Sequence, residues 1–217
     1  MIEAIIFDMD GTLVDTEPFH TEIELNQFKQ NKIEISGEEH QQYLGVTSEV
    51  MWRQIASKHS ISLTTDELIK QNHEESLKYF AALDSIPVMP ELVEVLEKLQ
   101  ANNYKLAVAS SSTPEIIDLV LTKTNLKKYF PIIVSGNDVA KSKPAPDIFL
   151  FTAHKLGAKP TNCVVIEDSP NGIKAAKAAG MTCVAYNGAN VNSEKLQEAD
   201  SIIQSYAELE RITIKSR

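Results

Sequence analysis

Asp8 and Asp10 stand two residues apart, directly after the apolar residues 5–7, in the N-terminal stretch MIEAIIFDMDGTLVDTE. Residues two apart in a strand point to the same side, so both carboxylates can face one pocket where the strand ends. One carboxylate can attack a phosphorus atom as a nucleophile, and the other can serve as a general acid and base. Gly11 permits a tight turn directly after them. The alternative is that Asp8 caps a turn and Asp10 caps the next helix.

A second pair of acids, Glu167 and Asp168, follows the apolar residues 163–166. Ser169 can cap the helix that comes next, which leaves both acids free for another role. With Asp8 they make an oxygen-rich set that suits Mg2+, an ion that prefers carboxylates, waters and phosphate oxygens. Such a cation would also offset the high cost of burying several carboxylates together. The alternative is a turn on the surface.

Two further segments carry groups that suit a phosphate. Lys143 lies in the stretch SKPAPDIF, where the prolines restrict the loop and can hold the lysine in place. Lys141 competes with it for that role. Ser110 follows the apolar residues 106–109, and its hydroxyl with the backbone N–H groups after it, beginning at Ser111, can cradle a phosphoryl group.

The elements that must position these residues alternate between short apolar strands and amphipathic helices from residue 87 onward. This alternation is typical of βαβ units, which predicts an α/β fold with a Rossmann-like parallel sheet and helices on both faces. The continuously apolar first strand belongs to the same sheet. Ligands of such sheets bind beyond the carboxyl ends of the strands. The acids, the serines and the lysine all follow strands, so we expect them to meet at that edge.

Residues 15–86 have a different sequence pattern, with apolar residues at helical spacing and no alternation of apolar and polar residues typical of strands. Thr64 or Thr65 is a suitable N-cap for the last of these helices. The pattern predicts an inserted α-helical cap domain at 15–86, and a catalytic core made of residues 1–14 and 87–217.

Composition excludes several classes of protein. The chain has 217 residues, a net charge of −9 and no dense block of lysine and arginine, which argues against a nucleic-acid surface. No apolar run approaches the ~20 residues of a membrane span, and the N-terminal acids argue against a signal peptide. Cys163 and Cys183 both begin apolar runs, which predicts two buried free thiols in a reducing cytoplasm.

The four segments, DMDGTLVD, Ser110 after a strand, Lys143 in K-P-x-P and Glu167–Asp168 after a strand, resemble in order the four motifs of the haloacid dehalogenase-like superfamily. With its helical insertion after the first strand, the whole chain resembles the β-phosphoglucomutase-like branch. The resemblance implies that Asp8 becomes an aspartyl-phosphate and that Asp10 is the acid/base with its backbone carbonyl on Mg2+. It also implies that Ser110 and Lys143 bind phosphate, and that Glu167 and Asp168 complete the metal site.

The cap resembles that of β-phosphoglucomutase only in part. His20 aligns with a cap histidine, but Ser48 stands in LGVTSE where the mutase has a phosphate-gripping arginine. Glu17 places a negative charge near the pocket, which suits a neutral polyol better than a second phosphate. Gly45 and Trp52 are further cap candidates, and for Trp52 packing is the favoured role.

These features predict a cytoplasmic, monomeric, Mg2+-dependent phosphatase that acts on small phosphate monoesters, with sugar phosphates favoured. The expected partner is a small phosphorylated metabolite, not a nucleic acid or a membrane. The first alternative is a β-phosphoglucomutase-type phosphohexose mutase. The second is a non-catalytic regulator that keeps the fold and binds metal or phosphate.

Overall fold

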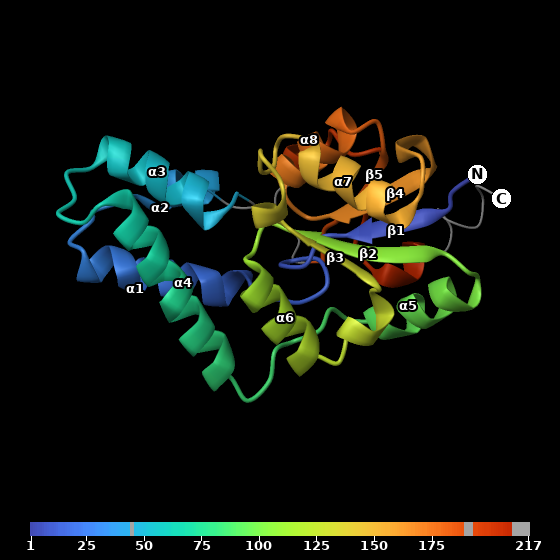
Figure 1. Cartoon of the computed structure of the whole chain (residues 1–217), viewed down its shortest axis with the longest axis horizontal. Helices are drawn as coiled ribbons and strands as arrows, with labels where there is room; N and C mark the ends of the chain where they lie inside the picture. The colour runs from blue at the N-terminus through green and yellow to red at the C-terminus, as the bar shows by residue number, and fades with distance from the viewer. Residues whose placement is uncertain (44–45, 189–192, 210–217) are drawn as a thin grey trace.

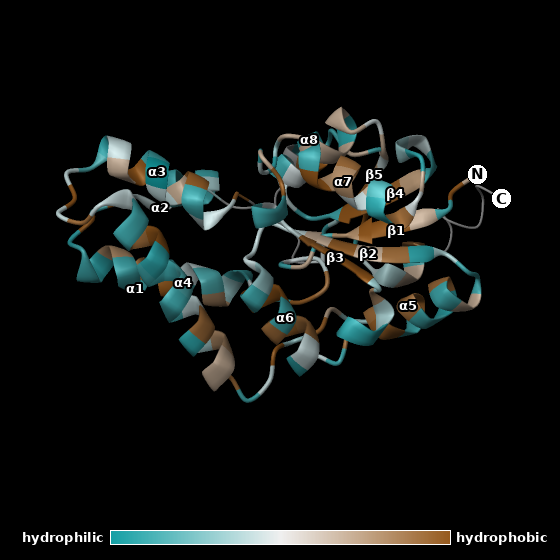
Figure 2. Ribbon diagram, viewed as in Figure 1, coloured by the Kyte–Doolittle hydropathy of each residue, from teal (hydrophilic) through white to brown (hydrophobic). Residues whose placement is uncertain are grey.

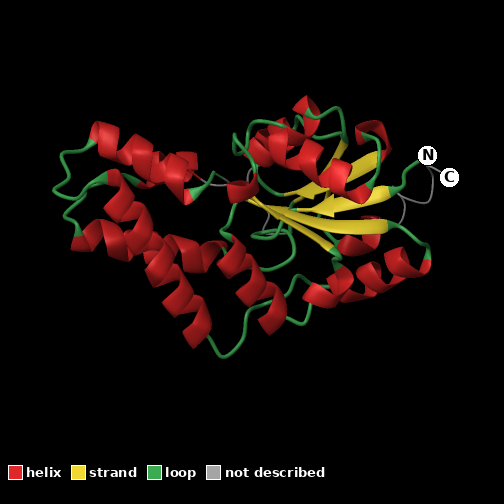
Figure 3. Cartoon of the chain, viewed as in Figure 1, coloured by secondary structure: helices red, strands yellow, loops and turns green. Residues whose placement is uncertain are grey.

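The computed structural model describes residues 1–43, 46–188 and 193–209. Within this part of the chain one parallel sheet of six strands has the order β3-β2-β1-β4-β5-β6 (Figure 3). The predicted parallel α/β sheet is therefore confirmed. The strands are β1 (Ala4–Phe7), β2 (Lys105–Ser110), β3 (Ile132–Ser135), β4 (Cys163–Glu167), β5 (Thr182–Tyr186) and β6 (Ser201–Ile203).

Helices cover both faces of the sheet, because the central strands are apolar on both sides. Ile5 and Phe7 of β1 pack in the same cluster as residues of α5 (Leu92–Ala101) and α6 (Pro114–Lys123). Ile6 packs in the opposite cluster, with residues of α7 (Asp147–Leu156) and α8 (Pro170–Ala178). Figure 1 shows the two pairs of helices on opposite sides of the strands, and Figure 2 shows the strands as the most hydrophobic layer. Full burial of each large side chain stabilises the fold by about 1.5–3 kcal/mol.

A block of four helices lies beside the core and away from the sheet (Figure 1). This helical block consists of α1 (Glu17–Gln30), α2 (Gly37–His40), α3 (Ser48–Lys58) and α4 (Thr65–Ala82). It has its own apolar cluster, in which Trp52 is fully buried and its ring centroid lies 5.3 Å from that of Phe28. Trp52 is therefore a packing residue, as the sequence favoured. Thr64 is the N-cap of α4, with a complete capping box.

The two chain segments that join the block to the core lie side by side. Val14 forms an antiparallel bridge with Val88, and the backbone N–H of Asp15 donates to the carbonyl of Pro87 at 2.9 Å. The domain boundaries after residue 14 and before residue 87 stay a prediction. The pairing of the two connecting segments at these positions supports it. Short 3-10 turns occupy Gln41–Tyr43, Lys127–Tyr129, Gly136–Asp138, Pro160–Asn162, Ser193–Leu196 and Tyr206–Glu208.

The strand order places a topological switch between β1 and β4, because the chain builds β2 and β3 on one side of β1 before it returns to the other. Ligand crevices in open parallel sheets form at such a switch. Cys163 and Cys183 are free and buried, as predicted. Among the helices of the described residues, none is both long and apolar enough to span a membrane.

Candidate active site

Asp8 and Glu167 meet across the topological switch. Phe7 pairs with Ile166 in the ladder between β1 and β4, and the Asp8 N–H continues that ladder by donating to the Ile166 carbonyl at 2.9 Å. The chain then turns tightly, with Gly11 at φ +76°. A Cβ atom on Gly11 would lie 2.1 Å from Oδ2 of Asp168, so only glycine lets Asp168 approach this turn.

Lys143 lies between the carboxylates at the ends of β1 and β4. Its Nζ atom is 2.5 Å from Oδ1 of Asp8 and 2.7 Å from Oε1 of Glu167, and it donates to the Ala109 carbonyl at 3.0 Å. The Lys143 side chain is only 1% exposed, whereas Lys141 is exposed. Burial alone would lower the pKa of Lys143, but the adjacent carboxylates outweigh it and hold that pKa above its usual value. The structure therefore places Lys143, and not Lys141, at this site.

The Glu167 side chain is fully engaged. Its Oε1 accepts from Lys143, while Oε2 accepts from the backbone N–H of Ser169 at 2.8 Å and from the Ser169 hydroxyl at 2.9 Å. Gly172 leaves room for this carboxylate, because a Cβ atom there would lie 1.6 Å from Oε1 of Glu167. Glu167 is thus arranged to orient Lys143. The predicted role of Glu167 as a metal ligand stays a prediction, and its saturated hydrogen bonds favour Asp168 for direct ligation.

The Asp10 carboxylate accepts hydrogen bonds from both sides of the crevice. Thr16 Oγ1 donates to its Oδ1 at 2.5 Å, and His20 Nε2 lies 3.1 Å from the same oxygen. Ser112 Oγ donates to Oδ2 at 2.8 Å. Burial raises the pKa of Asp10, but His20 and the hydroxyl donors outweigh it and lower that pKa to about 2. The pKa of His20 is lowered by burial and raised more by Asp10, to about 9. Asp10 is therefore held ionised.

The serine loop after β2 presents the predicted Ser111 to the crevice, together with Ser112, but not the predicted Ser110. Ser110 is fully buried beneath the surface, where its hydroxyl accepts from the Ser112 N–H at 3.0 Å and lies 3.5 Å from Oδ2 of Asp10. Ser111 and Ser112 line the cavity, and Ser110 does not. The sequence analysis assigned no role to Ser112 or Thr16; the run of three serines was the available signal for Ser112.

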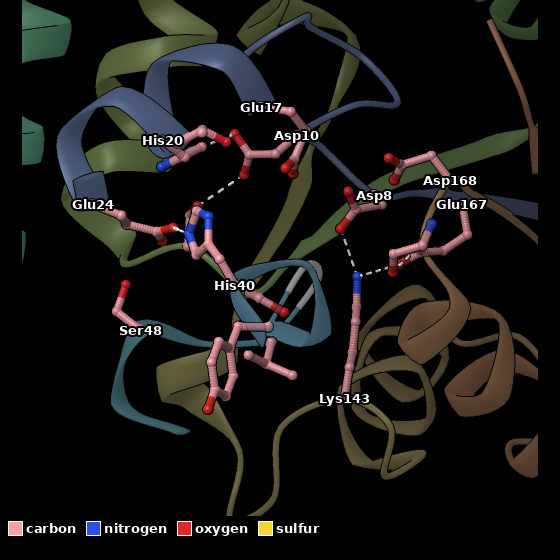
Figure 4. A pocket seen from close by; sticks show the side chains of 16 residues that line it. Asp8, Asp10, Glu17, His20, Glu24, His40, Ser48, Lys143, Glu167 and Asp168 are labelled. Carbon is pink, nitrogen blue, oxygen red and sulfur yellow. Dashed lines mark hydrogen bonds and ion pairs between the residues drawn. The ribbon is translucent and has the colours of Figure 1, made fainter. Parts of the chain in front are cut away.

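A cavity of about 80 Å³ lies between the helical block and the carboxyl ends of the strands. The core side is lined by Asp8, Asp10, Ser111, Ser112, Lys143, Glu167, Asp168 and Ser169. The helical block contributes Glu17, His20, Thr21, Glu24, His40, Tyr43, Val46 and Ser48 (Figure 4). Glu17 and His20 were predicted, whereas Thr21, Glu24, His40 and Tyr43 were missed because nothing in their spacing marks them. The candidate Gly45 lies outside the described residues.

Two acidic side chains of the helical block, Glu17 and Glu24, line the same cavity as Asp8 and Asp10. Burial raises the pKa of Glu17 to about 7, against the opposing effect of His20. Among the described residues that line the cavity, Lys143 is the sole lysine or arginine. Ser48 lines the cavity. It stands at the position where the mutase has an arginine and this chain does not. In the described part of the chain, the wall opposite Lys143 thus has acids and no lysine or arginine, and its protonated His20 is paired with Asp10.

Comparison with known proteins decides the family. Residues 5–186 match the family described as haloacid dehalogenase-like hydrolase. The chain belongs to the haloacid dehalogenase-like hydrolases. It is 33% identical over 180 residues to a phosphorylated carbohydrates phosphatase of Thermotoga maritima, which covers 83% of this chain and 82% of that one. It is 34% identical over 189 residues to a fructose-1-phosphate phosphatase of Escherichia coli, which covers 83% and 94%.

Among solved structures, β-phosphoglucomutase from Clostridium difficile superposes with a TM-score of 0.86 at 28% identity, over 100% of this chain and 96% of that chain. The predicted membership of the β-phosphoglucomutase-like branch of the haloacid dehalogenase-like hydrolases is therefore confirmed. Relatives with phosphatase names support a phosphatase hydrolase as the class of enzyme.

The acids of this haloacid dehalogenase-like site fit a divalent cation. Burial and the charges of Glu167 and Asp8 raise the pKa of Asp168 well above its usual value. Burial also raises that of Asp8, although Lys143 opposes it. Among the described residues, Lys143 alone thus offsets the charge of three carboxylates, which belong to Asp8, Glu167 and Asp168. In the described part of the chain no three His, Cys, Asp or Glu side chains could hold an ion by themselves. Asp8 and Asp168 would therefore need backbone, water or phosphate oxygens to complete the shell, which is the way Mg2+ binds.

Proposed function

We propose that the protein is a Mg2+-dependent phosphatase that hydrolyses small phosphate monoesters, in particular sugar phosphates, through an aspartyl-phosphate on Asp8. The observation that carries the proposal is the placement of Asp8 against buried Lys143. Asp10, two residues later in the chain, accepts its hydrogen bonds from other residues, Thr16 and Ser112. Two neighbouring carboxylates with different partners can take the two different roles of nucleophile and proton carrier.

In the first half-reaction Asp8 attacks the phosphorus, and Asp10 in its protonated form gives a proton to the leaving oxygen. In the second half-reaction the ionised Asp10 takes a proton from the water that cleaves the aspartyl-phosphate. Thr16, His20 and Ser112 hold the ionised Asp10 in place before substrate enters. Substrate entry would break some of these bonds, which would let Asp10 take up the proton it must donate.

Lys143 and the serine loop bind the transferred phosphoryl group in this proposal. Lys143 offers a fixed positive charge beside Asp8, and Ser111 and Ser112 border the cavity. Mg2+, held by Asp8, the backbone carbonyl of Asp10 and Asp168, would neutralise charge on the phosphoryl oxygens. Glu167 holds Lys143 in position rather than reaching the metal.

The helical block acts as a cap over this site and selects the substrate. A cavity of about 80 Å³ has room for a few water molecules and not for a sugar phosphate. The block must therefore move away from the core for substrate to enter, and its paired connections at Val14 and Val88 are the place for a hinge. Residues 15–86 are the proposed cap, and residues 1–14 and 87–217 are the proposed catalytic core.

A phosphohexose mutase is the second candidate, favoured by the structural similarity to β-phosphoglucomutase. A mutase must hold a sugar bisphosphate by both phosphates, which calls for cations on the wall opposite Lys143. Among the described residues that wall carries Glu17, Glu24 and Ser48 and no lysine or arginine, and its cationic His20 is already paired with Asp10. The charge of the cavity therefore favours hydrolysis of a monoester with a neutral, hydroxylated end.

A panel of phosphate monoesters, assayed with Mg2+ for both phosphate release and isomerisation between sugar 1- and 6-phosphates, tests the proposal. Release of phosphate from sugar monophosphates without isomerisation is the expected result. Isomerisation that a sugar bisphosphate stimulates would show a mutase, and absence of turnover of every monoester would show a non-catalytic protein. A cytoplasmic location and a monomeric state are parts of the same proposal.

A further inference from the structure

Glu24 and His40 form a partly buried pair on the wall of the cavity that faces the reacting carboxylates. Glu24 belongs to α1 and His40 is the last residue of α2, and His40 Nε2 lies 2.5 Å from Oε2 of Glu24 (Figure 4). Their side chains are 19% and 9% exposed. The His40 ring also meets the Phe28 ring edge to face, with centroids 5.4 Å apart. The histidine is thus held from two sides and fixes the orientation of the carboxylate.

The phosphoryl-transfer steps do not use this pair. Neither side chain has a hydrogen bond to Asp8, Asp10 or Lys143 among the residues that the structure describes. Both nevertheless line the same cavity as those residues. A largely buried polar pair of this kind gains little stability over an apolar contact of the same shape. A role in joining α1 to α2 therefore does not explain why a carboxylate lies at the wall of the cavity.

One oxygen of this carboxylate has no donor. Oε2 of Glu24 is taken by His40, while Oε1 receives no hydrogen bond from any described residue. This oxygen is not fully buried and lies on the cavity wall, so a hydroxyl donor from the substrate can take the place of solvent there. A sugar hydroxyl is such a donor, and a second phosphate is not, because it would be repelled. Thr21 and Ser48 place two more hydroxyl groups along this wall.

We infer that Glu24 is a specificity-determining residue that accepts a hydrogen bond from a hydroxyl group on the carbon skeleton of the substrate, and that His40 is its positioning residue. The substrate class is then a polyol or sugar that carries a single phosphate. This inference rests on the proposed phosphatase function and adds to it the group that recognises the end of the substrate remote from the phosphate. Sites built to bind a hydroxyl reject analogues that lack it.

The test compares sorbitol 6-phosphate with hexyl phosphate, which share a six-carbon chain and differ in hydroxyl groups. We expect wild-type kcat/KM to favour sorbitol 6-phosphate, and the Glu24→Ala variant to lose about ten- to hundredfold of that preference. Glu24→Gln, which keeps a neutral acceptor, retains part of it. His40→Phe keeps the contact with Phe28 and loses the bond to Glu24, so it lowers the preference by a smaller factor.

The matched control is a second Glu–His pair in the helical block. Glu39 lies 3.3 Å from His59 and neither residue lines the cavity. We expect Glu39→Ala to leave the preference unchanged, and turnover of hexyl phosphate by the Glu24 variants to show that they are folded. If Glu24→Ala keeps the wild-type preference, or wild type hydrolyses monoesters with no preference for hydroxylated ones, the inference is overturned and the proposed function stands. If wild type hydrolyses no phosphate monoester, both fail.

Discussion

The Nζ atom of Lys143 lies 2.5 Å from Oδ1 of Asp8, and the side chains of the two residues are 1% and 10% exposed. Lys143 reaches this position because Glu167 and the Ala109 carbonyl accept its other hydrogen bonds. The lysine therefore offsets the charge of a buried nucleophile and stays fixed where a phosphoryl group would arrive. It ties stability and activity to the same ion pair.

Replacement of this lysine should destabilise the fold. We expect Lys143→Met to lower the free energy of unfolding by about 3–5 kcal/mol, because it leaves Asp8 and Glu167 buried without their cation. Urea denaturation followed by circular dichroism measures the loss. The double variant Lys143→Met/Glu167→Gln should lose less than the sum of the single variants.

Lys127→Met is the control for that experiment, since Lys127 forms an exposed ion pair with Asp118. Its free energy of unfolding should stay close to that of wild type. A Lys143→Met variant as stable as Lys127→Met would show that the buried pair does not support the fold.

The glycine under Glu167 should be needed for turnover. A Cβ atom at position 172 would lie 1.6 Å from Oε1 of Glu167, so Gly172→Ala must displace the carboxylate that orients Lys143. We expect kcat to fall by about a hundredfold, the scale of a 1 Å misplacement in an active site. Gly37→Ala is the matched control, because a Cβ atom there meets nothing within 4 Å. Equal kcat values for the two variants would contradict the role given to Glu167.

Removal of the metal should abolish activity. A chelator is expected to stop phosphate release, and added Mg2+ to restore it. Asp168→Asn should raise the Mg2+ concentration for half-maximal rate at least about tenfold, since even outer-shell changes cost that much affinity. Asp118→Asn changes an exposed acid on α6 and serves as the control. An unchanged Mg2+ requirement in Asp168→Asn would remove Asp168 from the metal site.

A cation added opposite Lys143 should change what the cavity accepts. Ser48→Arg places a guanidinium on the wall of the helical block, where it could pair with a second phosphate. We expect a sugar bisphosphate to inhibit this variant about tenfold more strongly than wild type. Ser57→Arg, on the exposed face of α3, should leave inhibition unchanged. Equal inhibition of all three proteins would show that the charge of this wall does not select the substrate.

The sequence predicted the core of the molecule well because its signals are local. The apolar run before Asp8 and the one before Glu167 identify buried parallel strands, and their carboxyl ends must meet at one edge. Prolines beside Lys143 pointed to a fixed loop, and burial then distinguished it from Lys141. The βαβ order followed from the alternation of apolar strands and amphipathic helices.

The wall of the helical block could not be predicted in the same way. Glu24 and His40 are sixteen positions apart in the chain, and they meet only because α1 and α2 pack around Phe28. Polar residues on an amphipathic helix look alike in sequence whether they face solvent or a cavity. The serine loop shows a similar limit, because the turn after β2 decides that Ser112 and not Ser110 reaches the cavity.

The most direct test of the account is to locate the phosphoryl group on the enzyme during turnover. Asp10→Asn should slow the chemistry about 10²–10⁴-fold and retain the nucleophile. After acid quench of this variant with a sugar phosphate and Mg2+, peptide mass spectrometry should find one added phosphoryl group on Asp8. The variant Asp8→Asn should carry none and should lose turnover by on the order of 10⁴-fold or more. A phosphoryl group on Ser111 or Ser112, or undiminished turnover by Asp8→Asn, would contradict the central claim that Asp8 is the nucleophile.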